Sequence, residues 1–446
     1  MLVTEAEAEL KTPKETRKRK KRDLVEPAVK KVPKDMITYF NAIGSESMLQ
    51  KFPQQALKKK SRAPDGLYIA HEDAAEVIAE ALLKDLDKDQ TLIEANPGAG
   101  FLSKRLMNST SNNLMFYEPT KMFHSSLQDL IGERSAVIKD ADLSTLWRLA
   151  FIDKLEKGNR VDDALKGIRR TEYESDSNAR LFIATGSLVL LKYLINSVIF
   201  QNGLISYGRC ELFLCLPPYL MRHLTCSNEA GYMMYRATSV LFQLMFEYEF
   251  LGELDRKHFL PWQSEGKTTA QVKLSSFKKL NAGSMFLMKA VPRQNLFRYC
   301  TPENLAALWY FVHQNMTSRK NRVIPTLERW IPGCGPRLIV NRKAIVAPTL
   351  MHPNLDLSKL PKFIEPCRTL SNEDFVGSMN IFTEFGDLTP TQVLTLFDQF
   401  TSWPEYVECP FTASLENHLM KTQLNSDEHG DELEQPYDEE IEIVKE

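Results

Sequence analysis

The sequence predicts a mixed α/β protein with a mostly parallel, doubly wound sheet, followed by a smaller helical domain. Two observations predict this fold class. Apolar runs of strand length alternate with segments of helical periodicity between residues 66 and 290. In addition, residues 92–102 have the pattern of a strand, a glycine loop and a helix start, which opens many nucleotide-binding α/β domains.

The composition limits the possible classes of protein. A chain of 446 residues with 43% hydrophobic residues can form one large or two ordinary globular domains. No apolar run reaches the roughly 18 residues of a membrane-spanning helix, so we expect no membrane association. The seven cysteines form no C-x-x-C pair, and the eight histidines show no metal-binding spacing. We therefore expect free thiols, a reducing compartment and no bound metal.

Charge is unevenly distributed along the chain. Residues 1–63 lack hydrophobic periodicity and contain basic runs at 17–22 and 58–62, so we expect a disordered basic arm. This arm has three interpretations: a solvated tail, a polyanion-binding arm or a nuclear-localisation signal. Residues 423–446 are acidic and predict a disordered acidic tail. The acids Glu5, Glu7 and Glu9 argue against a mitochondrial transit peptide beginning at Met1.

The glycine loop after the first long apolar run is the main candidate for a ligand site. Glu94 precedes it, and Gly98 and Gly100 allow a sharp turn with close approach of the backbone to a ligand. The third glycine of a dinucleotide motif and the Gly-Lys-Ser/Thr of a Walker loop are both missing. An acid before the loop suits a cationic ligand, and S-adenosylmethionine carries a sulfonium and an amino group. The alternative interpretation is a plain tight turn between a strand and a helix.

Acids also follow the next two predicted strands. Glu118 ends the strand at 113–117, about 20 residues after the loop, where an acid can accept hydrogen bonds from ribose hydroxyls. The alternative is a surface acid after a strand. Asp140 and Asp142 follow a short strand at 137–138, and either could meet an adenine amine. The sequence does not distinguish between them.

The remaining elements complete the predicted domain order. Further strands are expected at 180–184, 211–216 and 284–290, and helices at 74–82, 188–198, 232–247, 301–312 and 389–397. Thr301 is expected to cap its helix through its hydroxyl. The predicted units are a basic arm at 1–63, an α/β domain at 64–297, a helical domain at 298–422 and an acidic tail at 423–446.

Three segments together resemble the rRNA adenine dimethyltransferase family: the loop at 94–102, the acid Glu118, and residues 291–297 (Val-Pro-Arg-Gln-Asn-Leu-Phe). The resemblance covers about residues 64 to 345 and is greatest to the animal mitochondrial branch that serves as transcription factors. It implies a class I S-adenosylmethionine-dependent methyltransferase (Rossmann-like) domain, with S-adenosylmethionine as a possible cofactor in a retained pocket. The implied cofactor-binding residues are Leu67, Ile69, Glu94, Gly98, Gly100, Glu118, and Asp140 or Asp142.

The family's catalytic Asn-Leu-Pro-Tyr motif is degenerate in this chain. Its place after the fourth strand falls on Ala184, Thr185, Gly186 and Ser187, so the amide and the aromatic ring that hold a flipped adenine are absent. Because positioning the amine is most of the catalytic work, this loss should slow methylation by several orders of magnitude. Tyr219 follows the fifth strand, and we interpret it as lying outside the motif.

The degenerate motif favours one of two functional hypotheses. In the first, the protein is a mitochondrial transcription initiation factor that binds mitochondrial RNA polymerase and melted promoter DNA in the matrix, and is monomeric outside that complex. In the second, it dimethylates adenines of mitochondrial small-subunit rRNA. The missing amide and aromatic ring favour the first hypothesis. The retained glycine loop is the reason to keep the second hypothesis. A nicotinamide-dependent oxidoreductase is disfavoured because the third glycine is missing.

Five basic side chains are the candidates for contact with nucleic acid. Arg319, Lys320 and Arg322 lie between two predicted helices, and Arg293 and Arg298 lie near the end of the last strand. We expect them to form a phosphate-contacting edge. The alternative for residues 318–322 is a solvated loop.

Overall fold

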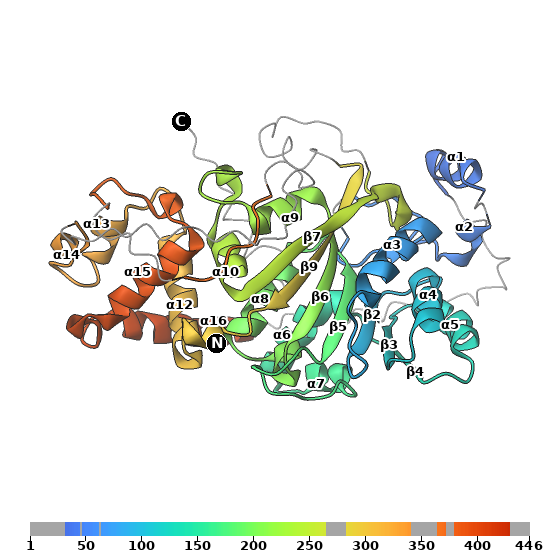
Figure 1. Ribbon diagram of the computed structural model, residues 1–446, viewed down its shortest axis with the longest axis horizontal. Coiled ribbons are helices and arrows are strands. Elements are labelled where there is room, and N and C mark those ends of the chain that lie inside the picture. Colours follow the sequence, from blue (N-terminus) through green and yellow to red (C-terminus); the bar gives the residue numbers. More distant parts are fainter. Residues whose placement is uncertain are drawn as a thin grey trace, which may run out of the picture.

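The computed structural model describes residues 32–44, 47–61, 64–264, 282–339, 364–371 and 379–428. A seven-stranded sheet runs through the middle of the molecule in the order β4-β3-β2-β5-β6-β9-β7 (Figure 1). Its parallel strands are β2 (Thr91–Ala95), β3 (Leu114–Tyr117), β4 (Ala136–Lys139), β5 (Ala179–Ala184) and β6 (Cys210–Leu216). β9 (Ser284–Pro292) runs antiparallel between β6 and β7 (Phe246–Asp255). The predicted mixed α/β class with a mostly parallel sheet is confirmed.

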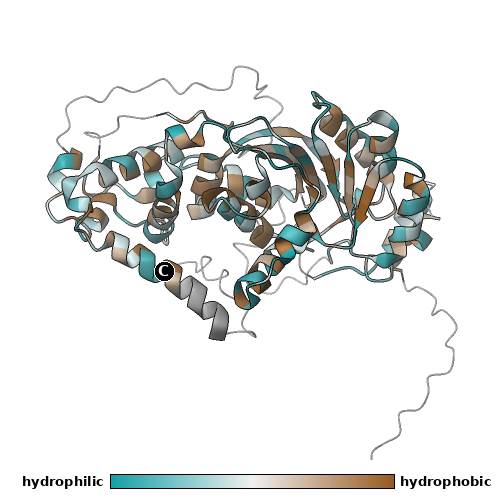
Figure 2. Cartoon of the chain, turned by 90° about the horizontal axis from the view of Figure 1, so that it is seen from below, coloured by the Kyte–Doolittle hydropathy of each residue, from teal (hydrophilic) through white to brown (hydrophobic). Residues whose placement is uncertain are grey.

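Both faces of the sheet are covered, because successive side chains of a strand point to opposite sides. Ile93 and Leu181 belong to one hydrophobic cluster, while Leu92 and Phe182 belong to the other. Figure 2 shows hydrophobic residues along the strands and the helices packed around them. Strands buried on both faces need continuous apolar runs, and such runs made them predictable from sequence.

Helices form a layer on each face. One layer contains α1 (Lys34–Ala42), α2 (Met48–Lys51), α3 (Glu72–Leu83), α4 (Phe101–Ser109) and α5 (His124–Ile131). The other contains α6 (Leu146–Glu156), α7 (Arg160–Leu165), α8 (Leu188–Ile199), α9 (Pro218–Thr225) and α10 (Ala237–Met245). A separate two-stranded sheet pairs β1 (Tyr68–Ile69) with β8 (Phe259–Leu260) in antiparallel orientation.

Five further helices lie at the end of the sheet opposite α1 and α2 (Figure 1). They are α12 (Pro302–Asn315), α13 (Val323–Leu327), α14 (Gly335–Ile339), α15 (Pro390–Ser402) and α16 (Phe411–Glu428). Phe311 and Phe397 of this group belong to the same hydrophobic cluster as the sheet residue Ile93. The hydrophobic core is therefore continuous across residue 298. The division of the chain into two domains at that residue stays a prediction.

The expectation of disorder throughout residues 1–63 is wrong for the part that the structure describes. α1 and α2 fold there, with Met36, Phe40 and Phe52 buried. Met36 and Phe40 stand one helical turn apart, a short signal that the surrounding charge obscured. The basic run at 17–22 lies outside the described residues. At the other end, α16 continues to Glu428, past the predicted start of the acidic tail, whose remainder is also outside the described residues.

The predicted amphipathic helix at 232–247 is wrong in extent and character. All nine residues of α10 are buried, and the chain changes to strand at Phe246. The first four residues of β7, Phe246 to Glu249, alternate between buried and exposed. That period of two is typical of a strand and was present in the sequence.

Two smaller expectations have clear outcomes. All seven cysteines are unpaired, which confirms the prediction of free thiols. Thr301 stands at the start of α12 but makes no side-chain capping hydrogen bond, whereas Thr389 accepts one from the backbone N–H of Gln392 at the start of α15. Among the described helices, none is both long and apolar enough to cross a membrane.

Candidate functional site

The loop between β2 and α4 has the tight geometry that its glycines predict. Asn96, Gly98 and Gly100 all have positive φ, at 56°, 57° and 79°. Glycine adopts this region freely and asparagine tolerates it. A Cβ atom on Gly98 would lie 2.7 Å from Cδ1 of Tyr68, so the aromatic ring rests directly on the backbone of the loop.

Glu94 lies inside the molecule beneath this loop. Its side chain is 2% exposed and accepts a hydrogen bond of 2.7 Å from the Ser103 hydroxyl in the first turn of α4. Burial, with a smaller contribution from the charge of Glu118, raises the pKa of Glu94 to about 8. At neutral pH the carboxyl is therefore mostly protonated.

Glu118 lies at the carboxyl end of β3 and is completely buried. Its Oε2 accepts a 2.8 Å hydrogen bond from the Gly98 backbone N–H, and its Oε1 accepts one of 2.8 Å from the Thr120 backbone N–H. The Tyr68 hydroxyl donates a longer bond of 3.5 Å to Oε1. Burial raises the pKa of Glu118, while the two backbone bonds oppose that rise. Each carboxylate oxygen is thus bonded to donors of the protein itself.

Tyr68 lies between the two implied cofactor-binding residues Leu67 and Ile69, and its side chain contacts the loop. Its neighbours Leu67 and Ile69 are buried in the hydrophobic core at 1% and 3% exposure, because alternate side chains point to opposite sides. The Tyr68 hydroxyl lies 2.9 Å from Oγ1 of Thr120. Burial raises its pKa to about 12, so the phenol is neutral and able to donate. The sequence reasoning named the two flanking residues and missed Tyr68.

The two candidate aspartates have different surroundings. Asp140 is exposed and its carboxylate lies 4.0 Å from Nζ of Lys121. Asp142 is partly buried, and its Oδ1 accepts hydrogen bonds from the backbone N–H and the hydroxyl of Ser144 at 2.9 and 2.6 Å. The charge of Asp142 adds to the rise in the pKa of Tyr68, whose main cause is burial.

The degenerate motif is covered by the chain itself. Ala184, Thr185, Gly186 and Ser187 are all buried at the carboxyl end of β5. Three hydrogen bonds join this corner to residues 64–67. They run from the Leu67 N–H to the Ala184 carbonyl (2.9 Å), from the Gly186 N–H to the Pro64 carbonyl (3.0 Å) and from the Thr185 hydroxyl to the Asp65 carbonyl. The hydroxyl of Ser187 caps α8 by accepting the Leu190 N–H.

Tyr219 is closer to this corner than the sequence suggested. Its hydroxyl lies 3.5 Å from the carbonyl oxygen of Gly186 and donates to it. β5 and β6 are parallel neighbours, so the residues that follow them meet at the same edge of the sheet. An aromatic ring is therefore present beside the motif, but the motif's own four residues include no amide to pair with it.

The predicted nucleic-acid residues separate into two groups. Arg293 is 2% exposed, donates to the carbonyls of Gln243 and Arg368 at 3.0 and 2.7 Å, and lies 3.5 Å from Glu247. A phosphate cannot reach this buried guanidinium, so the prediction for Arg293 is wrong. Arg298 is exposed.

The basic loop, defined as residues 318–322, is hydrogen-bonded to a second turn and lies at the surface. Lys320 and Arg322 are exposed, and Arg319 is partly exposed. The backbone N–H of Gly386 donates to the Arg319 carbonyl at 2.8 Å, which ties the loop to a second turn. The Arg322 guanidinium lies 5.2 Å from the ring centre of Phe382, whose side chain is 64% exposed.

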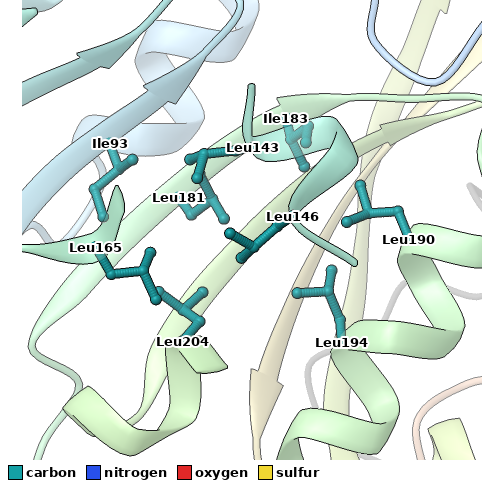
Figure 3. A pocket seen from close by; sticks show the side chains of 9 residues that line it. All are labelled: Ile93, Leu143, Leu146, Leu165, Leu181, Ile183, Leu190, Leu194 and Leu204. Carbon is teal, nitrogen blue, oxygen red and sulfur yellow. The ribbon is translucent and has the colours of Figure 1, made fainter. Parts of the chain in front are cut away.

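A cavity on the other side of the sheet does not provide an alternative site. It has a volume of about 10 Å³ and is lined only by leucine and isoleucine (Figure 3). Its lining is Ile93, Leu143, Leu146, Leu165, Leu181, Ile183, Leu190, Leu194 and Leu204. Ligand pockets for nucleosides are many times larger and carry polar groups, so this cavity is a packing void.

The fold and the site together define a class of protein. The sheet order with β9 reversed between β6 and β7, the glycine loop after β2 and the acid after β3 are those of a Rossmann-like domain of the class I S-adenosylmethionine-dependent methyltransferase type. The sequence is 40% identical over 383 residues to dimethyladenosine transferase 2, mitochondrial, of Drosophila melanogaster, spanning 84% of this chain and 85% of that protein. The chain belongs to this dimethyladenosine transferase family, and the predicted resemblance is confirmed.

Solved structures are more distant. A 23S rRNA methyltransferase, ErmE, aligns with 13% identity and a TM-score of 0.37 over 75% of this chain and all of that chain. A dimethyladenosine transferase from Plasmodium falciparum aligns with 11% identity and a TM-score of 0.41 over 74% of this chain and 96% of that one. No family model matches the sequence.

In the described conformation the Tyr68 side chain lies between the glycine loop and Glu118. The Tyr68 ring lies on Gly98, and both oxygens of Glu118 are already bonded to the protein. A bound nucleoside would need the same carboxylate and the same space above the loop. The glycine loop and the acid are retained, but the volume between them is filled.

Proposed function

We propose that this protein is a mitochondrial transcription initiation factor of the matrix, which works with mitochondrial RNA polymerase in promoter melting. One observation carries the proposal. The corner where a methyltransferase would hold an adenine is buried under residues 64–67 and contains Thr185, Gly186 and Ser187 in place of a clamp.

The chemistry of methyl transfer explains why this corner matters. An adenine must leave its stack and enter a pocket, and its amine must point in line at the methyl group. Here the Thr185 hydroxyl and the Gly186 N–H are bonded to backbone carbonyls of Asp65 and Pro64. Neither group is available to a base, so the fold supports binding of nucleic acid better than catalysis on it.

The exposed basic loop supplies the nucleic-acid contact in this proposal. Lys320 and Arg322 stand in solvent, and the ring of Phe382 beside Arg322 offers a surface on which an unpaired base can stack. Cations position a phosphate backbone without reading its sequence. This combination suits melted promoter DNA.

A second candidate function is dimethylation of adenines in mitochondrial small-subunit rRNA. The observation that favours it is the Tyr219 ring beside Gly186, since an aromatic ring at this corner can stack on a flipped base. Tritium transfer from labelled S-adenosylmethionine to the rRNA hairpin tests it. Strong transfer by the unaltered protein that is lost in Tyr219→Ala supports this second function.

Run-off transcription from a linear promoter tests the first function. Purified mitochondrial RNA polymerase is assayed with and without this protein, and we expect specific transcripts only when the protein is present. Adding S-adenosylhomocysteine is the control, and the yield of transcript should not change. Equal yields with and without the protein would contradict the proposal.

Removal of the loop charges tests the contact surface. In Arg319→Gln/Lys320→Gln/Arg322→Gln we expect weaker binding to melted promoter DNA. The slope of the logarithm of the association constant against the logarithm of salt concentration is negative. Its magnitude should decrease by about 0.7 for each lost phosphate contact to a single strand. The matched control replaces three exposed basic residues of the α/β domain by Gln, namely Lys84 and Lys88 before β2 and Arg134 before β4. An unchanged slope in the loop variant would count against this surface.

A further inference from the structure

Tyr68 lies where the glycine loop and the strand-end acid would receive a nucleoside. We propose that the Tyr68 side chain has permanently replaced the bound nucleoside, so that the cradle between Gly98 and Glu118 is filled from within. The inference does not depend on the transcriptional role, because it concerns the pocket alone. It assigns the loop a structural task, which is to fix the chain at 64–69 onto the sheet.

The hydrogen bonds around Glu118 place the Tyr68 phenol where a ligand hydroxyl would lie. An acid after the second strand of this fold serves a ligand by accepting hydrogen bonds from ribose hydroxyls. In this chain the hydroxyl that lies near Glu118 is the phenol of Tyr68, at 3.5 Å from Oε1, and it also lies 2.9 Å from Oγ1 of Thr120. The phenol therefore occupies the place of a ribose hydroxyl.

The Tyr68 ring also packs directly against the backbone of Gly98. A Cβ atom at Gly98 would come within 2.7 Å of the Tyr68 ring, which is closer than two carbon atoms can pack. The glycine that would let a ligand approach the backbone instead admits an aromatic ring. The Tyr68 ring also packs on Phe123 and Phe52, at centroid distances of 5.4 and 6.2 Å.

The electrostatics agree with this geometry. Glu94 is buried, bonded to Ser103 and mostly protonated at neutral pH, so it offers little attraction to a sulfonium or ammonium group. Glu118 accepts hydrogen bonds from two backbone N–H groups, which oppose the rise in its pKa that burial causes. A cationic cofactor would have to displace the Tyr68 ring from the loop.

The connection to the N-terminal helices explains what the fixed ring does. Phe52 follows α2 and contacts both Tyr68 and Phe123. The aromatic cluster thereby links the N-terminal helices to β1 and to the turn after β3. The same segment, 64–67, forms the three hydrogen bonds that cover the motif at 184–187.

Calorimetric titration with S-adenosylmethionine and with S-adenosylhomocysteine tests the proposal. The full chain is compared with Tyr68→Ala, Tyr68→Phe and the control Tyr39→Ala, which removes a ring that packs on Trp262 instead of the loop. We expect no binding up to about 1 mM by the unaltered chain, Tyr68→Phe and Tyr39→Ala. Tyr68→Ala should bind at least tenfold more tightly than this limit.

Either of two results overturns the proposal. Binding by the unaltered chain would show that Tyr68 moves aside and acts as a gate. Absence of binding by a folded Tyr68→Ala would show that something else closes the cradle. If Tyr68→Ala does not fold, as judged by circular dichroism, Tyr68→Leu replaces it with the same expected outcomes. Run-off transcription with the same preparations tests the proposed function separately. A change in cofactor binding does not imply a change in transcription, and a change in transcription does not imply a change in cofactor binding.

Discussion

Replacing Glu94 by Gln tests whether the acid below the loop is neutral in the folded protein. Gln has nearly the same shape, and its carbonyl can still accept the Ser103 hydroxyl. It cannot ionise, so it removes the proton equilibrium and little else. Because Glu94 is 2% exposed, an ionised carboxylate there would lose most of its hydration.

The size of the effect follows from the pKa. The ordinary value is 4.5, and burial raises the pKa of Glu94 to about 8 in the folded protein. Between these values the folded chain keeps a proton that the unfolded chain has released, so raising the pH favours unfolding. The stabilisation is fully present below pH 4.5 and is lost as the pH rises through about 8. Each pH unit amounts to about 1.4 kcal/mol, or roughly 4 kcal/mol between pH 5 and 8.

Urea unfolding at several pH values measures this quantity. We expect the free energy of unfolding of the unaltered chain, relative to Glu94→Gln, to fall by about 1.4 kcal/mol per pH unit over this range. Taking the difference cancels the titration of all other groups that both proteins share. Two parallel curves would refute the reasoning and would mean that Glu94 is ionised in the folded state.

Three further changes have defined outcomes. Arg180→Met should lower the free energy of unfolding, measured by thermal unfolding, by about 3 kcal/mol, because the buried guanidinium loses hydrogen bonds to the carbonyls of Leu82, Lys84 and Asp85. Glu211 keeps Lys289 at 2.8 Å, so its charge stays paired. Thr389→Ala should cost about 1 kcal/mol through loss of its capping bond, while Thr301→Ala, which has no such bond, should be nearly neutral in the same thermal unfolding assay. Deleting residues 429–446, which are strongly acidic, removes negative charge that repels DNA and should raise affinity for non-specific DNA in a fluorescence titration. Unchanged affinity would contradict this expectation.

The parallel part of the sheet and its glycine loop were predictable because their signals are local. Apolar runs such as residues 180–184 belong to strands that are buried on both faces, and a turn such as 96–100 needs residues that tolerate positive φ. The helices that begin at Pro302 and Pro390 also have local start signals. These features depend on neighbours within a few positions of the chain.

The covering of the site was not predictable, because it depends on residues far apart in sequence. Thr185 donates to Asp65 across 120 positions, and no spacing rule indicates such a bond. Arg293 looked like a surface cation, but its partners Gln243 and Arg368 come from distant segments. The importance of Tyr68 over its flanking residues follows from which side of a two-residue strand faces the loop.

The filled cradle has a consequence for how the protein responds to metabolism. A fold that binds a small molecule is stabilised by mass action, in proportion to the logarithm of ligand concentration divided by Kd. With the Tyr68 phenol against Thr120 and Glu118, this protein carries its pocket occupant as part of the chain. If Tyr68 keeps the cradle closed as proposed, S-adenosylmethionine adds no such term to the stability of this protein.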